Sequence, residues 1–258
     1  MLYMFSNKSR YNRKKKKNGN NKKRQTQTFE KKVLSVIHKQ AENKQIPAQI
    51  VRNTRITNQL TDNILQVVKL TPNIVQGSGE GERVGNSVTT RKAMLYFSAH
   101  LFQINNASNS DPPKYLDIYI YKFKPSNDQS AITLGNFLNL GSSSTLYDSL
   151  NVPESGAFPV NNDKFTLKKH IRKLLWNPNT NNTYALASRH IMNACAFKMD
   201  ITPYLKKTLM YNDGVTNLVT NDNLYISCVY TNNDDQQYAA NTVVGEFDTL
   251  MTYEFEDL

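Results

Sequence analysis

Residues 74–102 read IVQGSGEGERVGNSVTTRKAMLYFSAHLF, and this stretch decides the fold class that the sequence predicts. Four of the ten glycines in the chain fall within nine residues of it, at positions 77, 79, 81 and 85. Glycines this dense are typical of a backbone that bends sharply or adopts positive φ. From Ser87 to Phe102, neither glycine nor proline interrupts a run of β-branched and aromatic residues that is typical of a strand. The stretch therefore predicts a turn that leads into a long strand.

The glycine-rich turn has three interpretations. A dinucleotide-binding fingerprint requires G-x-G-x-x-G between a strand and a helix, but Glu82 stands in the place of the third glycine and the following segment is strand-like. A phosphate-binding P-loop requires G-x-x-x-x-G-K-[S/T], whereas Glu80 and Glu82 would repel phosphate here. The third interpretation is a structural turn that leads into a sheet, with Arg83 bound to a nearby carboxylate, and we favour it.

The same turn carries a family resemblance. Residues 76–86 resemble the QG-x-G-E-x-x-R-x-G-[N/D] segment near the start of the jelly roll in capsid proteins of small circular, Rep-encoding single-stranded DNA viruses (circovirus-like). The satellite tobacco necrosis virus coat protein carries a looser form, and Asp163–Lys168 is similar to a second recurring element of the group. The resemblance implies a jelly-roll subunit and an icosahedral shell of about sixty copies. The matching residues are Gln76, Gly77, Gly79, Glu80, Arg83, Gly85 and Asn86.

Charge is distributed unevenly along the 258 residues, whose net charge is +11. Residues 1–44 contain fourteen Lys and Arg and two acidic residues, a net charge of +12. The remaining residues contain eighteen basic and nineteen acidic side chains, so the body is nearly neutral. A neutral body with a strongly basic tail is the pattern of a folded domain that carries an arm for binding a polyanion.

Residues 1–28 are expected to form a disordered basic arm, because after the first five residues almost nothing apolar is present to offset the entropy of ordering. No acidic residue precedes Glu30, which favours binding of nucleic acid through phosphate contacts. A solubilising tail and a nuclear import signal are the alternatives. The residues assigned to nucleic-acid binding are Lys8, Arg10, Arg13, Lys14, Lys15, Lys16, Lys17, Lys22, Lys23 and Arg24.

Residues 29–45 are expected to form a short amphipathic helix and linker. Phe29, Val33, Ile37 and Ala41 recur at helical spacing along one stripe, and Lys and Glu occupy the opposite face. Pro47 is expected to stop this helix.

Residues 46–258 predict an all-β body, a single eight-stranded antiparallel jelly-roll sandwich without a second domain boundary. Apolar and polar residues alternate along 243–256, which indicates one buried face, whereas both faces of 115–124 are apolar and indicate burial on both sides. A short helix is expected at 133–140. The expected strands lie near residues 64–71, 87–103, 115–124, 164–175, 190–201, 223–231 and 243–256, with a further one near 207–211.

Catalytic and metal-binding patterns are missing from the sequence. The four histidines are scattered, no H-E-x-x-H motif, Cys/His cluster or G-x-S-x-G elbow occurs, and we expect neither an enzyme nor a cofactor. Asp222, Asp234 and Asp235 fall in loop-like stretches, where solvated carboxylates are commoner than calcium sites. Cys195 and Cys228 are expected to be free thiols, with a disulfide as the alternative.

A second basic run, residues 168–173, contains Lys168, Lys169, His170, Arg172 and Lys173 on an expected strand. A solvated strand face and a patch that faces nucleic acid are equally good interpretations of it. We expect neither a secretory signal nor membrane insertion, because the apolar start is only five residues long and no later stretch approaches the length of a membrane span.

These observations favour a capsid protein that self-assembles and packages single-stranded DNA through its arm without sequence recognition. The arm is rich in lysine, whereas circovirus-like arms are rich in arginine, which weakens the case for bidentate phosphate contacts. Alternatives are the coat protein of a satellite-type single-stranded RNA virus, a monomeric nucleic-acid-binding protein and a jelly-roll carbohydrate-binding protein. The expected partners are further copies of the chain, single-stranded nucleic acid and a nuclear import receptor. The expected locations are the virion and the host nucleus or cytoplasm.

Overall fold

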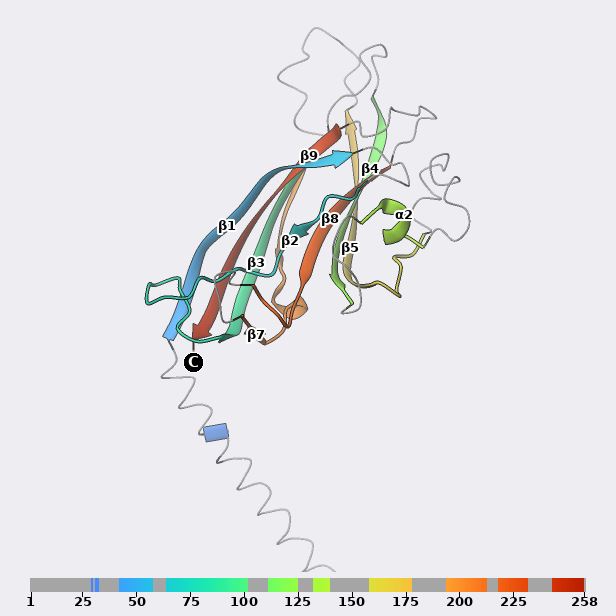
Figure 1. Cartoon of the computed structure of the whole chain (residues 1–258). Coiled ribbons are helices and arrows are strands. Elements are labelled where there is room, and N and C mark those ends of the chain that lie inside the picture. The colour runs from blue at the N-terminus through green and yellow to red at the C-terminus, as the bar shows by residue number, and fades with distance from the viewer. Residues whose placement is uncertain are drawn as a thin grey trace, which may run out of the picture. The chain divides into compact units, whose positions relative to one another are not determined.

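The computed structural model describes residues 29, 31–32, 42–57, 64–101, 111–124, 132–139, 158–177, 194–212, 218–231 and 243–257. Apart from its last residue, the chain divides into two compact units, residues 1–42 and residues 43–257. In the first unit, Phe29, Lys31 and Lys32 are helical, within the range expected to form the amphipathic helix. The second unit consists mostly of strands (Figure 1).

The strands form two antiparallel sheets. The first sheet has the order β1-β9-β3-β6, with β7 also paired to β3, and the second has the order β2-β8-β4-β5. Every predicted strand range contains a strand, and α2 lies within the predicted helix, so the all-β prediction is confirmed. The described elements are β1 Glu42–Thr57, β2 Val68–Lys69, β3 Ser87–Leu101, β4 Asp111–Phe123, α2 Leu134–Phe137, β5 Phe165–Asn177, β6 Ala194–Asp200, the 3-10 turn η2 Thr202–Tyr204, β7 Thr208–Met210, β8 Leu224–Thr231 and β9 Val243–Asp257.

The longest ladder of the structure pairs β3 with β9. Its register runs from Val88 opposite Asp257 to Leu101 opposite Gly245, with one bulge between Thr90 and Lys92. Alternate residues of both strands point into the core between the sheets, as the alternation along 243–256 predicted. On β9 the buried residues of this face are Gly245, Phe247, Thr249, Met251, Tyr253 and Phe255.

The second sheet is buried on both faces, as the sequence of 115–124 predicted. Leu116, Ile118 and Ile120 of β4 belong to the core between the sheets. On the opposite face the aromatic side chains of β4 pack against α2, where the Phe137 ring lies 4.8 Å from the Tyr121 ring. The sheet is therefore covered by a segment of its own chain, with further contributions from residues flanking α2.

β1 corrects the prediction for the N-terminal part of the body. The strand spans Glu42–Thr57, so it begins inside residues 29–45, the range assigned to a helix and linker. Ile46 is buried and Val51 packs against the same core. Because their positions differ by an odd number, a strict alternation would place them on opposite faces of the strand. Asn53 has φ of 55°, in the left-handed region, which is unusual for a residue other than glycine. Because the inward face changes along the strand, its sequence does not show the period of two that identifies strands.

The first sheet presents its outer face, defined as the face that points away from the second sheet, to solvent. On β3 the residues of this face include the exposed Tyr96, Ser98 and His100, and on β6 they include Ala196 and Lys198. The two sheets thus differ in the exposure of their outer faces: aromatic residues of the chain itself cover that of the second sheet, whereas that of the first is exposed.

Gly245 marks the closest approach of β9 to β3. A Cβ atom at this position would lie 2.5 Å from the His100 carbonyl oxygen, and backbone atoms of a paired strand cannot yield easily. We expect Gly245→Ala to lower the free energy of unfolding by about 1–3 kcal/mol, the usual cost of overpacking. Urea unfolding measures this, with Thr252→Ala on the outward side of β9 as the control; equal stabilities of the two variants would contradict the prediction.

Candidate functional site

The arm lies outside the described residues, and so do all of its assigned nucleic-acid-binding residues, Lys8, Arg10, Arg13, Lys14, Lys15, Lys16, Lys17, Lys22, Lys23 and Arg24. The other predicted site, the glycine-rich turn, is described throughout. Three described regions are candidates for a functional site: the turn, the second basic run on β5 and the outer face of the first sheet.

The turn is built around the side chain of Arg83, which is completely buried. Its Nε donates to the Ile74 carbonyl at 3.2 Å, and its Nη1 donates to the Gly85 carbonyl at 2.5 Å and to the Asn86 Oδ1 at 3.1 Å. The guanidinium also lies over the ring of Tyr211, 4.7 Å from the centroid. We expected a carboxylate partner; the described hydrogen bonds go to neutral oxygens and occupy the Nε and Nη1 donors of the arginine fork.

The other turn residues that match the family segment, except Glu80, also take part in hydrogen bonds within the turn. The backbone N–H of Gly77 donates to the Arg83 carbonyl at 2.9 Å, and the Gln76 side chain donates to the Val84 carbonyl at 3.1 Å. The Glu82 carboxylate accepts from the Gly79 N–H at 2.7 Å.

Gly77 and Gly79 serve a spatial purpose in this turn. A Cβ atom would lie 2.1 Å from the Glu82 Oε2 at Gly77 and 2.9 Å from it at Gly79. Glu82, the residue that breaks the dinucleotide fingerprint, therefore fills the concavity where a phosphate would have to sit. Its negative charge excludes a phosphate from this turn, as expected.

A buried ion pair connects the turn to the end of β9. The Lys44 Nζ donates to the Glu82 carbonyl at 2.9 Å and lies 3.3 Å from the Asp257 Oδ2, and both side chains are buried. The same carboxylate oxygen accepts from the backbone N–H of Val84. Sequence reasoning missed this pair, because its members are 213 residues apart and Lys44 lies in the range expected to form a helix and linker.

The second basic run divides into two parts on β5. Arg172 donates to Asp117 through Nε and Nη2, both at 2.8 Å, and the His170 Nε2 lies 2.6 Å from the Asp117 Oδ1. The His170 ring also stacks on Tyr119, with ring centroids 4.5 Å apart. Sequence reasoning missed this cluster, because the pairing of Asp117 opposite Arg172 depends on strand register.

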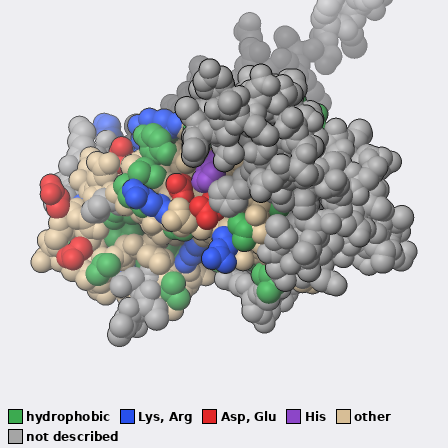
Figure 2. Space-filling model, turned by 90° about the horizontal axis from the view of Figure 1, so that it is seen from above, with side chains coloured by type: hydrophobic (Ala, Val, Ile, Leu, Met, Phe, Trp, Pro, Cys, Tyr) green, Lys and Arg blue, Asp and Glu red, His purple; other side chains and the backbone are tan. Residues whose placement is uncertain are grey.

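The lysines of this run, Lys168, Lys169 and Lys173, are exposed on β5, which lies at the edge of the second sheet. Charged side chains, lysine above all, are a common means of keeping an edge strand from pairing with another chain. At this edge the solvated interpretation of the run is the simpler one. Figure 2 shows basic, acidic and apolar side chains interspersed on the described part of one end of the molecule, as a nearly neutral body would have.

Asp222, expected to be a solvated loop carboxylate, is buried. Asp222 pairs with Lys122 and accepts from the backbone N–H of Lys206 at 2.7 Å. Within the described residues, no group of three or more His, Cys, Asp or Glu side chains is arranged to hold a metal ion; Asp234 and Asp235 lie outside them. Cys195 and Cys228 are both free thiols.

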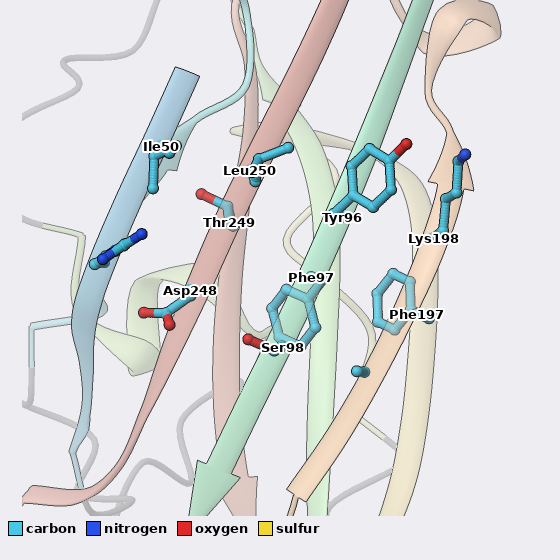
Figure 3. A pocket seen from close by; sticks show the side chains of 11 residues that line it. Ile50, Tyr96, Phe97, Ser98, Phe197, Lys198, Asp248, Thr249 and Leu250 are labelled. Atoms are coloured by element: carbon cyan, nitrogen blue, oxygen red, sulfur yellow. The ribbon is translucent and has the colours of Figure 1, made fainter. Parts of the chain in front are cut away.

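The outer face of the first sheet carries a hollow of about 490 Å³ (Figure 3). Four of the five strands of the sheet contribute to its lining, with Ile50 on β1, Leu250 on β9, Tyr96 on β3 and Lys198 on β6. The sequence did not predict this site, because its residues come together only through the strand order.

Comparisons with known proteins do not extend the resemblance seen in the sequence. No protein-family model matches the chain, and no match was found among curated proteins. Among the described residues, no helix is long and apolar enough to cross a membrane.

Replacement of Arg83 tests the importance of the turn. Arg83→Met would leave several buried carbonyl oxygens without their donor, and we expect the free energy of unfolding to fall by about 3 kcal/mol or more. Arg83→Lys keeps the charge but not the fork, so its loss should be intermediate. Urea unfolding provides the measurement, with Arg55→Lys on the exposed side of β1 as the control. A loss below about 1 kcal/mol for Arg83→Met would contradict this description.

Acid sensitivity tests the Asp117 cluster. Burial opposes ionisation of Asp117, but hydrogen bonds from His170 and Arg172 outweigh it and lower the pKa of the carboxyl. Its contribution to stability is then present above the unfolded pKa of about 3.9 and disappears as pH falls through the lower folded pKa.

We expect Asp117→Asn to cost about 2–4 kcal/mol at pH 7, because it leaves a guanidinium without its carboxylate. The difference from the unmodified protein should shrink as pH falls below about 4. Unfolding by urea at a series of pH values measures both, with the exposed Asp163→Asn as the control. A difference that stays constant down to acid pH would show that the cluster does not depend on the ionised carboxylate.

Proposed function

We propose that this chain is the capsid protein of a small virus, with a jelly-roll body that assembles into a closed shell and a basic arm that packages a single-stranded genome. The observation that carries the proposal is the combination of the strand order with the separation of charge between arm and body.

The strand order supports a jelly roll. When the short β7 is left out, the first strand of the body pairs with the last, β1 with β9. The second strand pairs with the second-last, β2 with β8. The inner strands pair likewise, β3 with β6 and β4 with β5. A chain paired in this way is one long antiparallel ribbon folded over and rolled into two four-stranded sheets, which is the arrangement of two Greek keys in a jelly roll.

The charge distribution supports packaging by the arm. The first 44 residues carry +12, while the rest of the chain is close to neutral, so attraction to a polyanion is concentrated in one segment. Residues 1–28 carry ten basic and no acidic side chains, so sixty arms would bring about 600 positive charges, comparable to the phosphates of a large part of a small genome at one charge per nucleotide. Such binding reads no sequence and weakens with salt, with a slope near −0.7 per phosphate on single strands.

The glycine-rich turn and the neutral body support a structural role over catalysis. Arg83 and its partners fix the turn that leads into β3, and the concavity of the turn is filled by a carboxylate. A turn held by several buried hydrogen bonds suits a subunit that must repeat the same contacts many times. Single-stranded DNA is the proposed cargo because residues 76–86 resemble the circular DNA virus group; a satellite-type RNA genome would present the same backbone charge.

Charge-neutralised variants test this function. Purified at low salt, the full chain should form closed particles by negative-stain microscopy and carry nucleic acid by its ratio of absorbance at 260 and 280 nm. Replacing Lys14–Lys17 and Lys22–Arg24 by Gln should remove most of the nucleic acid, because the arm supplies the phosphate contacts.

The matched control replaces Lys168, Lys169 and Lys173 of β5 by Gln and should retain the nucleic acid. Equal losses in the two variants would indicate binding by the body instead of the arm. A monodisperse monomer that binds single strands without assembling would show a nucleic-acid-binding module, and a monomer without such affinity would overturn both.

A further inference from the structure

The hollow on the outer face of the first sheet has a floor of small side chains. Ser98 on β3 lies opposite Ala196 on β6 and opposite Asp248 on β9. On one side of this row Tyr96 lies opposite Lys198 and Leu250, so larger side chains form a wall. Figure 3 shows Tyr96, Lys198 and Leu250 side by side at this wall.

A second depression of about 430 Å³ continues the hollow along the strands. It shares Ser98 and Ala196 with the first and adds Ala194 and His100, so small side chains again form the floor. Tyr96 and His100 are four residues apart on β3, which places their side chains about 13 Å apart along the strand. After allowance for the thickness of the two rings, about 10 Å remains, enough for two or three flat rings stacked at about 3.4 Å.

An aromatic ring and positive charge lie together at the wall. Tyr96 is 37% exposed, and the Lys198 Nζ lies over one face of its ring, 4.8 Å from the centroid. Arg52 of β1 is also exposed and lines the hollow. Aromatic side chains on which bases stack, beside cations that follow the backbone, are the common means of binding single-stranded nucleic acid without sequence preference.

One acidic side chain lines the same hollow. Asp248 accepts a hydrogen bond from the backbone N–H of Asn53 at 2.7 Å, which fixes one of its oxygens beside β1. The lining therefore has two cations and one carboxylate, and a strand can place its phosphates toward Arg52 and Lys198. A base amino group is a suitable donor to the carboxylate.

We propose that this hollow binds unpaired bases of the single strand that the shell packages, with Tyr96 as the stacking platform. The inference rests on the proposed function, and it adds a contact on the body to the charge contacts of the arm. A second copy of the chain is the less suitable occupant, because a protein surface would have to desolvate two cations without a matching pair of carboxylates.

Photo-crosslinking on the full chain tests the site. The protein is loaded with a single-stranded oligonucleotide containing 5-iodouracil, irradiated and digested with trypsin, and the cross-linked peptides are identified by mass spectrometry. We expect a cross-link on the peptide that contains Tyr96. Tyr96→Leu and Ala196→Trp should each reduce this cross-link about fivefold or more, the first by removing the platform and the second by filling the floor.

The controls separate this inference from the proposed function. Tyr115→Leu, on the second sheet, should leave the cross-link near residue 96 unchanged. Particles that contain nucleic acid but cross-link only through arm peptides would overturn the site and leave the capsid proposal standing. If particles do not form, the same cross-linking on the unassembled chain decides the site. Protection of β3 and β6 from hydrogen exchange in particles without nucleic acid would show that a second copy covers the face instead.

Discussion

The buried guanidinium of Arg83 joins the two ends of its own turn, at Ile74 and at Gly85 and Asn86, to a segment distant in sequence, after β7 at Tyr211 and Asn212. A buried charge is costly unless hydrogen bonds replace its water, and the turn supplies those bonds from its own carbonyl groups. The position at which β3 begins is thereby fixed, and the ladder of β3 with β9 and β6 follows from it. Gly77 and Gly79 leave room for the Glu82 carboxylate.

In the proposed capsid protein, the body forms the shell and the arm binds the genome. Several buried carboxylates of the body are paired with basic side chains, as in Asp257 with Lys44 and Asp117 with Arg172, and the body is nearly neutral. Such pairs hold geometry and contribute little attraction for a polyanion. The attraction is left to the arm, while the exposed hollow beside Tyr96 offers bases a surface that charge alone does not provide.

Sequence reasoning succeeded where one strand carries its own signal and failed where a contact depends on several strands. The uninterrupted run of β3 and the alternation of β9 predicted both strands, and the apolar faces of β4 predicted its burial on both sides. β1 was missed because its inward face changes near Asn53 and its sequence is polar. The Arg83 turn was located from its glycines, but its partner Tyr211 and the hollow on the first sheet depend on strand order, which the sequence pattern does not contain.

The central claim is that many copies of this chain close into a shell around nucleic acid. Sedimentation velocity of the full chain at low salt, recorded at both 260 and 280 nm, tests it most directly. We expect one fast boundary with the mass of about sixty subunits plus nucleic acid, which slows and loses its absorbance at 260 nm when the basic clusters of the arm are neutralised. A single slow boundary with the mass of one 29.5 kDa chain, unchanged by added single-stranded DNA, would contradict it.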